Sequence, residues 1–348
     1  MPSRRHLLGL GLLGGVGLGL RGSSGPSDPS PPAVTPDSVD TVDTADTLAV
    51  RTARSRAAGI PTGMTGYEHV GVPVGTSLTP RRSSFTSSAD GEVLEFVDLR
   101  GLVTINHRDV TIRYCRITST GDPKIRVNSA RHRGASLHLH DCVVRGASDT
   151  DHGTAIGYGN YTAERVWVTR CEDAFRLGAN ATIDTCLTDG QSIARLPNGS
   201  RVHTDGVQST GADNADGVWS TVRNSSLLAV RVDGSKGNSA VILGSEGPRV
   251  DGENLGTPTR NILVEGNFFS DGSYSVMQKA PENARGLMEN IVFRDNVYAG
   301  NGEYGEIAVP RWAVGKYVTF TDEVTADGSR AGLSYWAKSA TAPDWFKG

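Results

Sequence analysis

The chain has 348 residues, of which 37% are hydrophobic and only 6% aromatic, and it carries a formal net charge of −3. Its 43 glycines make up about 12% of the sequence, against a typical share of about 7%. This composition excludes a coiled coil and a highly charged disordered chain, and it argues against an ordinary helical enzyme. Because the charges nearly balance, the chain lacks the basic field that phosphate binding requires, so we expect no nucleic acid partner.

The first residues have the pattern of an export signal. Arg4 and Arg5 precede a short run rich in Gly and Leu, which is typical of a twin-arginine signal peptide and which we place at residues 1–22. Residues 23–58 are rich in Ser, Pro, Asp and Thr and are predicted to be a disordered linker. The sequence therefore predicts a secreted, extracellular protein with no membrane anchor in its mature form and one folded domain at residues 59–348.

A short strand motif recurs along the body of the chain, with alternating apolar residues and a small or polar residue at its end. The period of two places the apolar residues on one buried face of each strand. Repeats at intervals of roughly 20 or more residues are typical of solenoids. The motif predicts an all-β fold, a single-domain right-handed parallel β-helix with terminal caps, the C-terminal one beginning at about residue 301. The copies are Val110–Cys115, Leu137–Cys142, Val166–Cys171, Ala181–Cys186, Ser220–Ser225, Ile262–Asn267 and Ile291–Asn296.

The four cysteines end four successive copies of this motif, at Cys115, Cys142, Cys171 and Cys186. Four cysteines in an exported protein would ordinarily suggest disulfides. Because these four occupy one equivalent position, we interpret them as reduced thiols packed in an internal ladder. The interval of 15 residues between Cys171 and Cys186 is shorter than the others, which indicates either a very compact coil or a shifted register.

Chemically active residue types gather on a second set of strands that follow the ladder strands. The segment His203-Thr-Asp-Gly-Val-Gln208 brings an imidazole, a carboxylate and an amide within six residues. One coil earlier, Asp173 aligns with Asp205 and Arg176 aligns with Gln208, at the ~4.8 Å spacing of neighbouring strands. The pattern predicts a strip of acids, bases and amides that suits a sugar polymer lying along the sheet. The alternative is that Asp-Gly is an ordinary turn and that Asp173 only caps a bend.

Three more residues extend this strip. His152 lies one coil before Asp173 in the predicted stack, and Lys279 falls near the same column two coils after Gln208. Tyr158 is one of the few aromatic residues expected to face outward there. We therefore assign Gln208, His152 and Tyr158 to substrate binding.

The stacked strands, the ladder and the His203–Gln208 segment together resemble exported bacterial right-handed β-helix proteins of the pectate-lyase-like superfamily, over about residues 65–310. In that superfamily an Asp at such a place often helps to bind calcium, and an Arg or Lys removes a proton. The resemblance therefore implies a Ca²⁺ site with Asp173 and Asp205 as ligands. The sequence departs from the lyase pattern in two ways. Gln208 is not a second acid, and no Arg-x-Pro-x-x-Arg signature follows the Asp-Gly strand.

These residues suit three functions, of which the sequence favours the first. The first is a polysaccharide lyase that cleaves an acidic polysaccharide by β-elimination, with a bound cation or Arg176 neutralising the uronate carboxylate. The catalytic set is then Asp205 with Arg176, His203 and Lys279, of which the last three are candidate bases. The second is a glycoside hydrolase that uses Asp173 and Asp205 as its carboxylate pair. The third is a non-catalytic glycan-binding or surface protein. We expect a monomer in each case.

Overall fold

The structure is a computed structural model, and it describes residues 46–129, 131–132, 134–244, 257–279 and 287–336. The predicted signal peptide lies outside the described residues, and so does most of the predicted linker. No helix in the described part of the chain is long and apolar enough to span a membrane.

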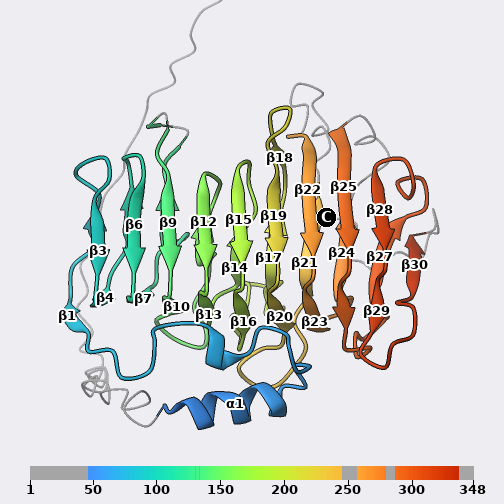
Figure 1. The fold of residues 1–348 in the computed structure, drawn as a ribbon, viewed down its shortest axis with the longest axis horizontal. Coiled ribbons are helices and arrows are strands. Elements are labelled where there is room, and N and C mark those ends of the chain that lie inside the picture. The colour runs from blue at the N-terminus through green and yellow to red at the C-terminus, as the bar shows by residue number, and fades with distance from the viewer. Residues whose placement is uncertain (1–45, 130, 133, 245–256, 280–286, 337–348) are drawn as a thin grey trace, which may run out of the picture. The chain divides into compact units, whose positions relative to one another are not determined.

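Three parallel sheets, here called A, B and C, run along the structure (Figure 1). Sheet A contains, in spatial order, β1 (Thr79–Arg81), β4 (Val97–Arg100), β7 (Arg116–Ser119), β10 (Val143–Gly146), β13 (Trp167–Thr169), β16 (Leu187–Asp189), β20 (Ser226–Ala229), β23 (Phe268–Asp271), β26 (Val297–Tyr298) and β29 (Val324–Thr325). Sheet B contains β2 (Phe85–Thr86), β5 (Val103–Ile105), β8 (Ile125–Val127), β11 (Ile156–Gly157), β14 (Asp173–Arg176), β17 (Asp205–Ser209), β21 (Ser239–Gly244), β24 (Val276–Lys279), β27 (Ile307–Pro310) and β30 (Leu333–Trp336). Sheet C contains β3 (Val93–Glu95), β6 (Val110–Arg113), β9 (Leu137–His140), β12 (Tyr161–Glu164), β15 (Ala181–Asp184), β19 (Ser220–Arg223), β22 (Thr259–Glu265), β25 (Met288–Arg294) and β28 (Val318–Thr321), with β18 (Ala212–Asp213) beside β22.

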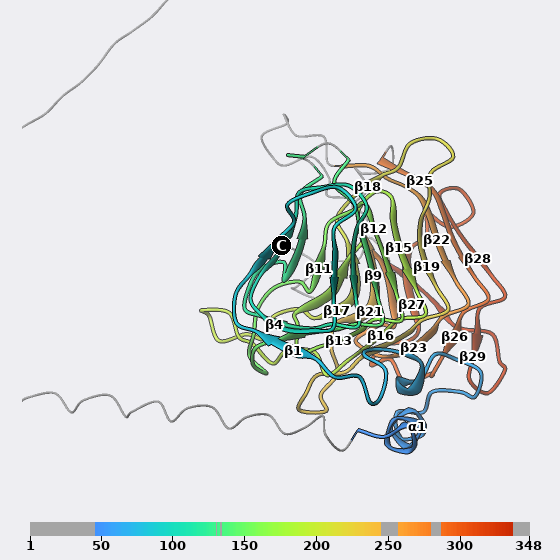
Figure 2. The same cartoon turned by 60° about the vertical axis from the view of Figure 1, so that its left-hand side comes forward.

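This architecture is a right-handed parallel β-helix, so the predicted fold is confirmed. The chain visits sheets C, A and B in turn, and Figure 2 shows the sheets arranged around a narrow interior. Aliphatic side chains such as Val110, Ile112, Leu139 and Ile183 fill that interior, each with an exposure of 0 or 1%. They do so because a strand turns every second side chain to the same face.

A residue in the left-handed backbone region makes the sharp bend between each sheet C strand and the next sheet A strand. The φ angles of these residues lie between 51° and 62°, which few side chains other than those of Asn and Asp adopt readily. The residue after each bend belongs to the internal ladder. The bend residues are Phe96, Tyr114, Asp141, Arg165, Thr185, Asn224, Gly266, Asp295 and Asp322. The ladder runs through Val97, Cys115, Cys142, Val166, Cys186, Ser225, Asn267, Asn296 and Glu323.

The predicted register of one repeat is wrong. Sheet C pairs β12, and not the predicted segment 166–171, with β9 and β15. Val166 therefore occupies the ladder position, and Cys171 follows the sheet A strand β13. The two segments share the alternating pattern, and Arg170 before Cys171 also has a left-handed φ of 56°. With this correction the coil from Val166 to Cys186 has an ordinary length, and the short interval disappears.

All four cysteines are free and buried, as predicted. In the ladder, the Cys115 backbone N–H donates a hydrogen bond to Cys142 Sγ at 3.4 Å. Further along, the Asn267 side-chain amide donates to the Val222 carbonyl oxygen at 3.0 Å and to Asn296 Oδ1 at 2.9 Å. The ladder therefore provides partners for buried backbone groups at the bend, which would otherwise cost folding free energy.

Glu323 ends the ladder as a buried acid, and it makes stability depend on pH. Burial raises the pKa of Glu323 from 4.5 to about 7, although hydrogen bonds from Tyr298 and Asn296 oppose the rise. The native state therefore holds this proton more tightly than the unfolded chain, so the stabilisation is complete below about pH 4.5 and is lost as the pH rises through about 7. Relative to Glu323→Gln, we expect the free energy of unfolding of the native sequence to fall by up to about 3 kcal/mol over that interval. Denaturant unfolding of both proteins at several pH values measures the difference. A constant difference would contradict the buried, protonated acid.

The N-terminal segment begins with a helix that the sequence analysis did not predict. Helix α1 (Leu48–Ala57) lies within the region expected to be a disordered linker, so the folded part begins before residue 59. Its N-cap is Thr47, whose hydroxyl accepts a hydrogen bond from a backbone N–H of the first turn. The Arg51 guanidinium donates to the carbonyl oxygens of Val70 at 2.8 Å and Val72 at 2.9 Å. Composition could not show these contacts, because they join residues about twenty positions apart.

The same segment covers the outer face of sheet A. Tyr67 is the first residue of the short 3-10 helix η2 (Tyr67–His69), and its ring packs edge to face on Trp167. The Tyr67 hydroxyl and the Trp167 indole N–H both donate to the Asp189 carboxylate, at 2.5 and 2.7 Å. The apolar cluster beneath the segment consists of Ile60, Tyr67, Val70, Leu187, Leu228 and Phe268. The N-terminal segment therefore covers the outer face of sheet A, whereas the predicted strip of site residues lies on sheet B.

The C-terminal part of the described chain continues the coils. The sequence predicted a cap from about residue 301, but β27, β28, β29 and β30 extend all three sheets beyond that point. Trp312, which falls within the predicted cap, packs against the main core together with Tyr317. The short, irregular strands of these last coils hide the repeat in the sequence.

Candidate functional site

The predicted strip of chemically active residues lies on the central strands of sheet B. Strands β14 and β17 pair in parallel, with Asp173 opposite Asp205 and Arg176 opposite Gln208. This is the alignment that the sequence predicted. On the next coil, Ser239 of β21 stands opposite Asp205.

An irregularity at the start of each strand brings the acid and the basic or amide side chain together. Strict alternation would place Asp173 and Arg176, three residues apart, on opposite faces. Ala174 and Phe175 are both part of the core, so the alternation is interrupted between them. As a result Arg176 Nη2 lies 3.4 Å from Asp173 Oδ2.

The two aspartates form a buried, coupled pair. Asp173 is 5% exposed and Asp205 is 0% exposed, and the Asp205 backbone N–H donates to Asp173 Oδ1 at 3.3 Å. Burial, together with the negative charge of Asp205, raises the pKa of Asp173 well above its usual range. Burial also raises the pKa of Asp205.

Hydrogen bonds from the next coil distinguish the two acids. Asn238 Nδ2 donates to Asp205 Oδ1 at 2.8 Å, and the Ser239 hydroxyl donates to the same oxygen. These bonds and the nearby His203 oppose the rise in the pKa of Asp205. Because they favour the ionised form of Asp205, the negative charge of Asp205 raises the pKa of Asp173 further, while the Arg176 cation opposes that rise.

The residues of this site do not fit the calcium ion that the family resemblance implied. The carboxylate of Asp205 is fully buried, and one of its oxygens already accepts two hydrogen bonds. Calcium takes six to eight oxygen ligands, yet the described residues contain no group of three or more His, Cys, Asp or Glu side chains able to hold a metal ion. We therefore derive no step through a metal at Asp173 and Asp205.

The remaining predicted residues lie in loops beside sheet B or further along it. His203 is an exposed loop residue just before β17. His152 is half exposed, and its Nδ1 lies 3.6 Å from Glu172 Oε2. Tyr158, 51% exposed, follows β11. Lys279 pairs with Gly244 in the backbone register, and its side chain is outside the described part.

Lys279 is therefore offset from the column in which the sequence placed it. The column of Arg176 and Gln208 continues through Ile242 and Met277, and Lys279 lies two residues further along its strand. Ile242 and Met277 form a small buried apolar cluster with Ala308. The polar strip thus ends after Gln208, and its centre is the aspartate pair.

Sequence reasoning missed several residues of this centre. Asn238 and Ser239 could have been found, because Ser239 begins a strand that the sequence predicted and aligns with Asp205. The buried ion pair of Lys124 and Asp151, with Nζ and Oδ2 3.7 Å apart, had no such signal. Lys124 is fully buried, and it also donates to the His152 carbonyl oxygen at 3.0 Å.

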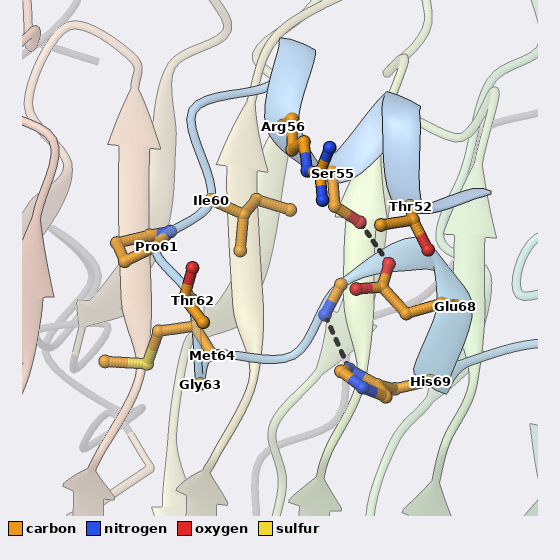
Figure 3. A pocket seen from close by; sticks show the side chains of 11 residues that line it. Thr52, Ser55, Arg56, Ile60, Pro61, Thr62, Gly63, Met64, Glu68 and His69 are labelled. Atoms are coloured by element: carbon orange, nitrogen blue, oxygen red, sulfur yellow. Dashed lines mark hydrogen bonds between the residues drawn. The ribbon is translucent and has the colours of Figure 1, made fainter. Parts of the chain in front are cut away.

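A separate pocket lies in the N-terminal segment (Figure 3). It has a volume of about 330 Å³ and is lined by Thr52, Ser55, Arg56, residues 60–64, Gly66, Glu68 and His69. The Ser55 hydroxyl donates to Glu68, and the Gly66 N–H donates to His69 Nδ1. None of the predicted site residues lines this pocket.

No family model and no curated protein matches the sequence. One solved structure that resembles the chain is the catalytic unit of the thermostable GH87 alpha-1,3-glucanase from Streptomyces thermodiastaticus strain HF3-3, with 18% sequence identity and a TM-score of 0.34. The match covers 75% of this chain, and the chain spans about half of that one, 52%. A similarity of this size carries no argument about activity, so the functional proposal rests on the site itself.

Proposed function

We propose that this protein is an exported, carbohydrate-active β-helix enzyme that hydrolyses glycosidic bonds in a polysaccharide lying along sheet B. One observation carries the proposal, namely the coupled pair of Asp173 and Asp205 on adjacent strands. Two carboxyl groups whose surroundings push their pKa values apart are the pattern by which an acid and its ionised partner are assigned. The twin-arginine export route and the monomeric state are part of the same proposal.

In this mechanism Asp173 donates a proton to the glycosidic oxygen as the bond breaks. Asp205 stays ionised, because Asn238 and Ser239 donate hydrogen bonds to it, and its charge stabilises the positive charge that develops on the sugar ring. Neighbouring strands are ~4.8 Å apart, which is close to the ~5–5.5 Å between carboxyl groups in retaining glycosidases. Water then adds to the anomeric carbon from the side of the departed sugar and gives a proton to the Asp173 carboxylate, which restores the acid. The proposal therefore includes retention of the anomeric configuration. Arg176 and Gln208, half-buried beside the pair, would bind substrate hydroxyl groups.

A lyase acting on an acidic polysaccharide is the second candidate, and Arg176 favours it. The Nε atom of Arg176 is buried and has no hydrogen-bond partner among the described residues, so it has capacity to bind a uronate carboxylate. His203 would then be the base. This candidate lacks a use for the protonated Asp173, which is why we place it second.

The products distinguish the two reactions. We expect the purified protein, incubated with a panel of neutral and acidic polysaccharides, to release new reducing ends without ultraviolet absorbance from unsaturated uronate. Reducing ends accompanied by that absorbance on a uronate polymer would replace the hydrolase with the lyase. Binding to a glycan with no product of either kind would show a non-catalytic protein and overturn both candidates.

A further inference from the structure

A group of buried polar atoms lies inside the corner between sheets A and B, next to Asp205. Gln191 is 2% exposed, and Thr188 and Thr204 are each 0% exposed. Among the described residues, neither amide atom of Gln191 has a hydrogen-bond partner, and neither threonine hydroxyl has one. Of the ten buried side-chain polar atoms without a hydrogen-bond partner among the described residues, four belong to these three residues.

Two glycines allow these atoms to pack closely against the backbone. A Cβ atom at Gly237 would lie 2.3 Å from Gln191 Oε1 and 2.9 Å from Thr204 Oγ1. A Cβ atom at Gly206 would lie 2.5 Å from the Ala240 carbonyl oxygen and 3.1 Å from Thr188 Oγ1. Any larger residue at either position would collide with its neighbours, and the Gln191 and Thr204 oxygens converge on Gly237.

These polar groups lie beside the strand that carries Asp205. Thr204 and Gly206 flank Asp205 in the sequence, and Gly237 precedes Asn238, whose side chain donates to the Asp205 carboxylate. The orphan amide and hydroxyl groups thus surround the backbone that holds this acid.

We propose that Gln191, Thr188 and Thr204 form a binding site for ordered water, and that Gln191 acts through this water as a positioning residue for Asp205. A buried amide that lacks any partner costs folding free energy, and proteins satisfy such groups with internal water that makes about three hydrogen bonds. Water can accept from the Gln191 amide N–H and donate to the hydroxyl and amide oxygens. The inference deepens the proposed function, since Asp205 is one of its two acids.

The sign of a stability change tests the water site. We expect Gln191→Met and the isosteric Thr204→Val each to lower the midpoint of thermal unfolding, by at least about 2–4 °C, because they leave bound water and its other partners unsatisfied. Thr221→Val is the matched control for Thr204→Val, since it makes the same exchange at a half-buried position of β19 on sheet C and should leave the midpoint nearly unchanged. A rise in the midpoint for Gln191→Met or Thr204→Val would overturn the site, because removing orphan polar groups from a dry interior stabilises a protein.

Two further readouts need no substrate, so they can fail independently of the proposed hydrolysis. A high-resolution crystal structure should show water within hydrogen-bonding distance of the Gln191 amide, and solvent-free density there would contradict the proposal. NMR titration of the carboxyl groups should show a shifted apparent pKa for the aspartate pair in Gln191→Met and not in Thr221→Val. An unchanged titration would limit Gln191 to a structural role and overturn its assignment as a positioning residue.

Discussion

Replacement of Asp173 with asparagine is expected to lower the turnover number for polysaccharide hydrolysis by about 10²–10⁴-fold, the usual contribution of a general acid. Asparagine keeps the shape of the side chain but has no proton to donate. The pKa of Asp173 is raised by burial and by the charge of Asp205, so the proposed acid keeps its proton to a higher pH than an exposed aspartate does. Its rate should therefore fall as the pH rises through the pKa of Asp173, and this limb of the pH profile should be absent in Asp173→Asn. Initial rates of reducing-end release across pH measure both effects.

Two further variants test whether the loss of activity is specific to the aspartate pair. Asp205→Asn should lose a similar amount of activity, because it removes both the stabilising charge and the repulsion that keeps Asp173 protonated. Asp184→Asn makes the same chemical change on sheet C, where Asp184 pairs with Arg223, and it should remain fully active. An Asp173→Asn protein with native turnover would show that the pair is only structural.

Truncation of Phe175 to alanine is expected to destabilise the protein by about 3–5 kcal/mol, as is typical for a large aromatic residue in a core. Phe175 is 0% exposed, and it is one of the largest fully buried side chains of the described residues. Its strand also carries Asp173 and Arg176, so the cavity would loosen the site as well as the core. Chemical denaturation with a two-state fit measures the change in the free energy of unfolding.

The control for this variant is Phe96→Ala, which removes the same ring from a position that is 42% exposed. The Phe96 ring stacks on Tyr114 with centroids 5.2 Å apart, so we expect a cost of about 1 kcal/mol. If Phe175→Ala were no more costly than Phe96→Ala, the interior of the β-helix would not be packed as the structure shows.

The sequence predicted the fold because the β-helix repeats its local pattern on every coil. Alternating apolar residues in short strands were enough to define sheet C and the register of Asp173 with Asp205. The same alternation predicts the wrong register where two adjacent segments both fit it. For this reason the sequence places Cys171 in the ladder instead of Val166. Helix α1 was missed because the residues that hold it, such as Val70 and Val72, are distant in sequence.

The candidate site was predictable in its position and not in its environment. Strict alternation could not reveal that Ala174 and Phe175 are both internal, so the contact between Asp173 and Arg176 was unforeseen. Burial of the acid pair depends on the loops and on the next coil, which supplies Asn238 and Ser239. Gln191 had no sequence signal, because a buried glutamine with no partner breaks the patterns on which prediction relies.

The central claim is that Asp173 and Asp205 hold a proton near neutral pH, and NMR titration of the carboxyl carbons tests it most directly. Protein labelled with ¹³C at the aspartate carboxyl groups should be titrated alongside Asp173→Asn and Asp205→Asn, which assign the two signals. We expect one proton to remain on the pair at pH values where exposed aspartates are fully ionised, and the remaining acid in each single variant to titrate differently from its behaviour in the pair. If both acids ionised together near the ordinary aspartate pKa of about 3.9, the account of the site would be wrong.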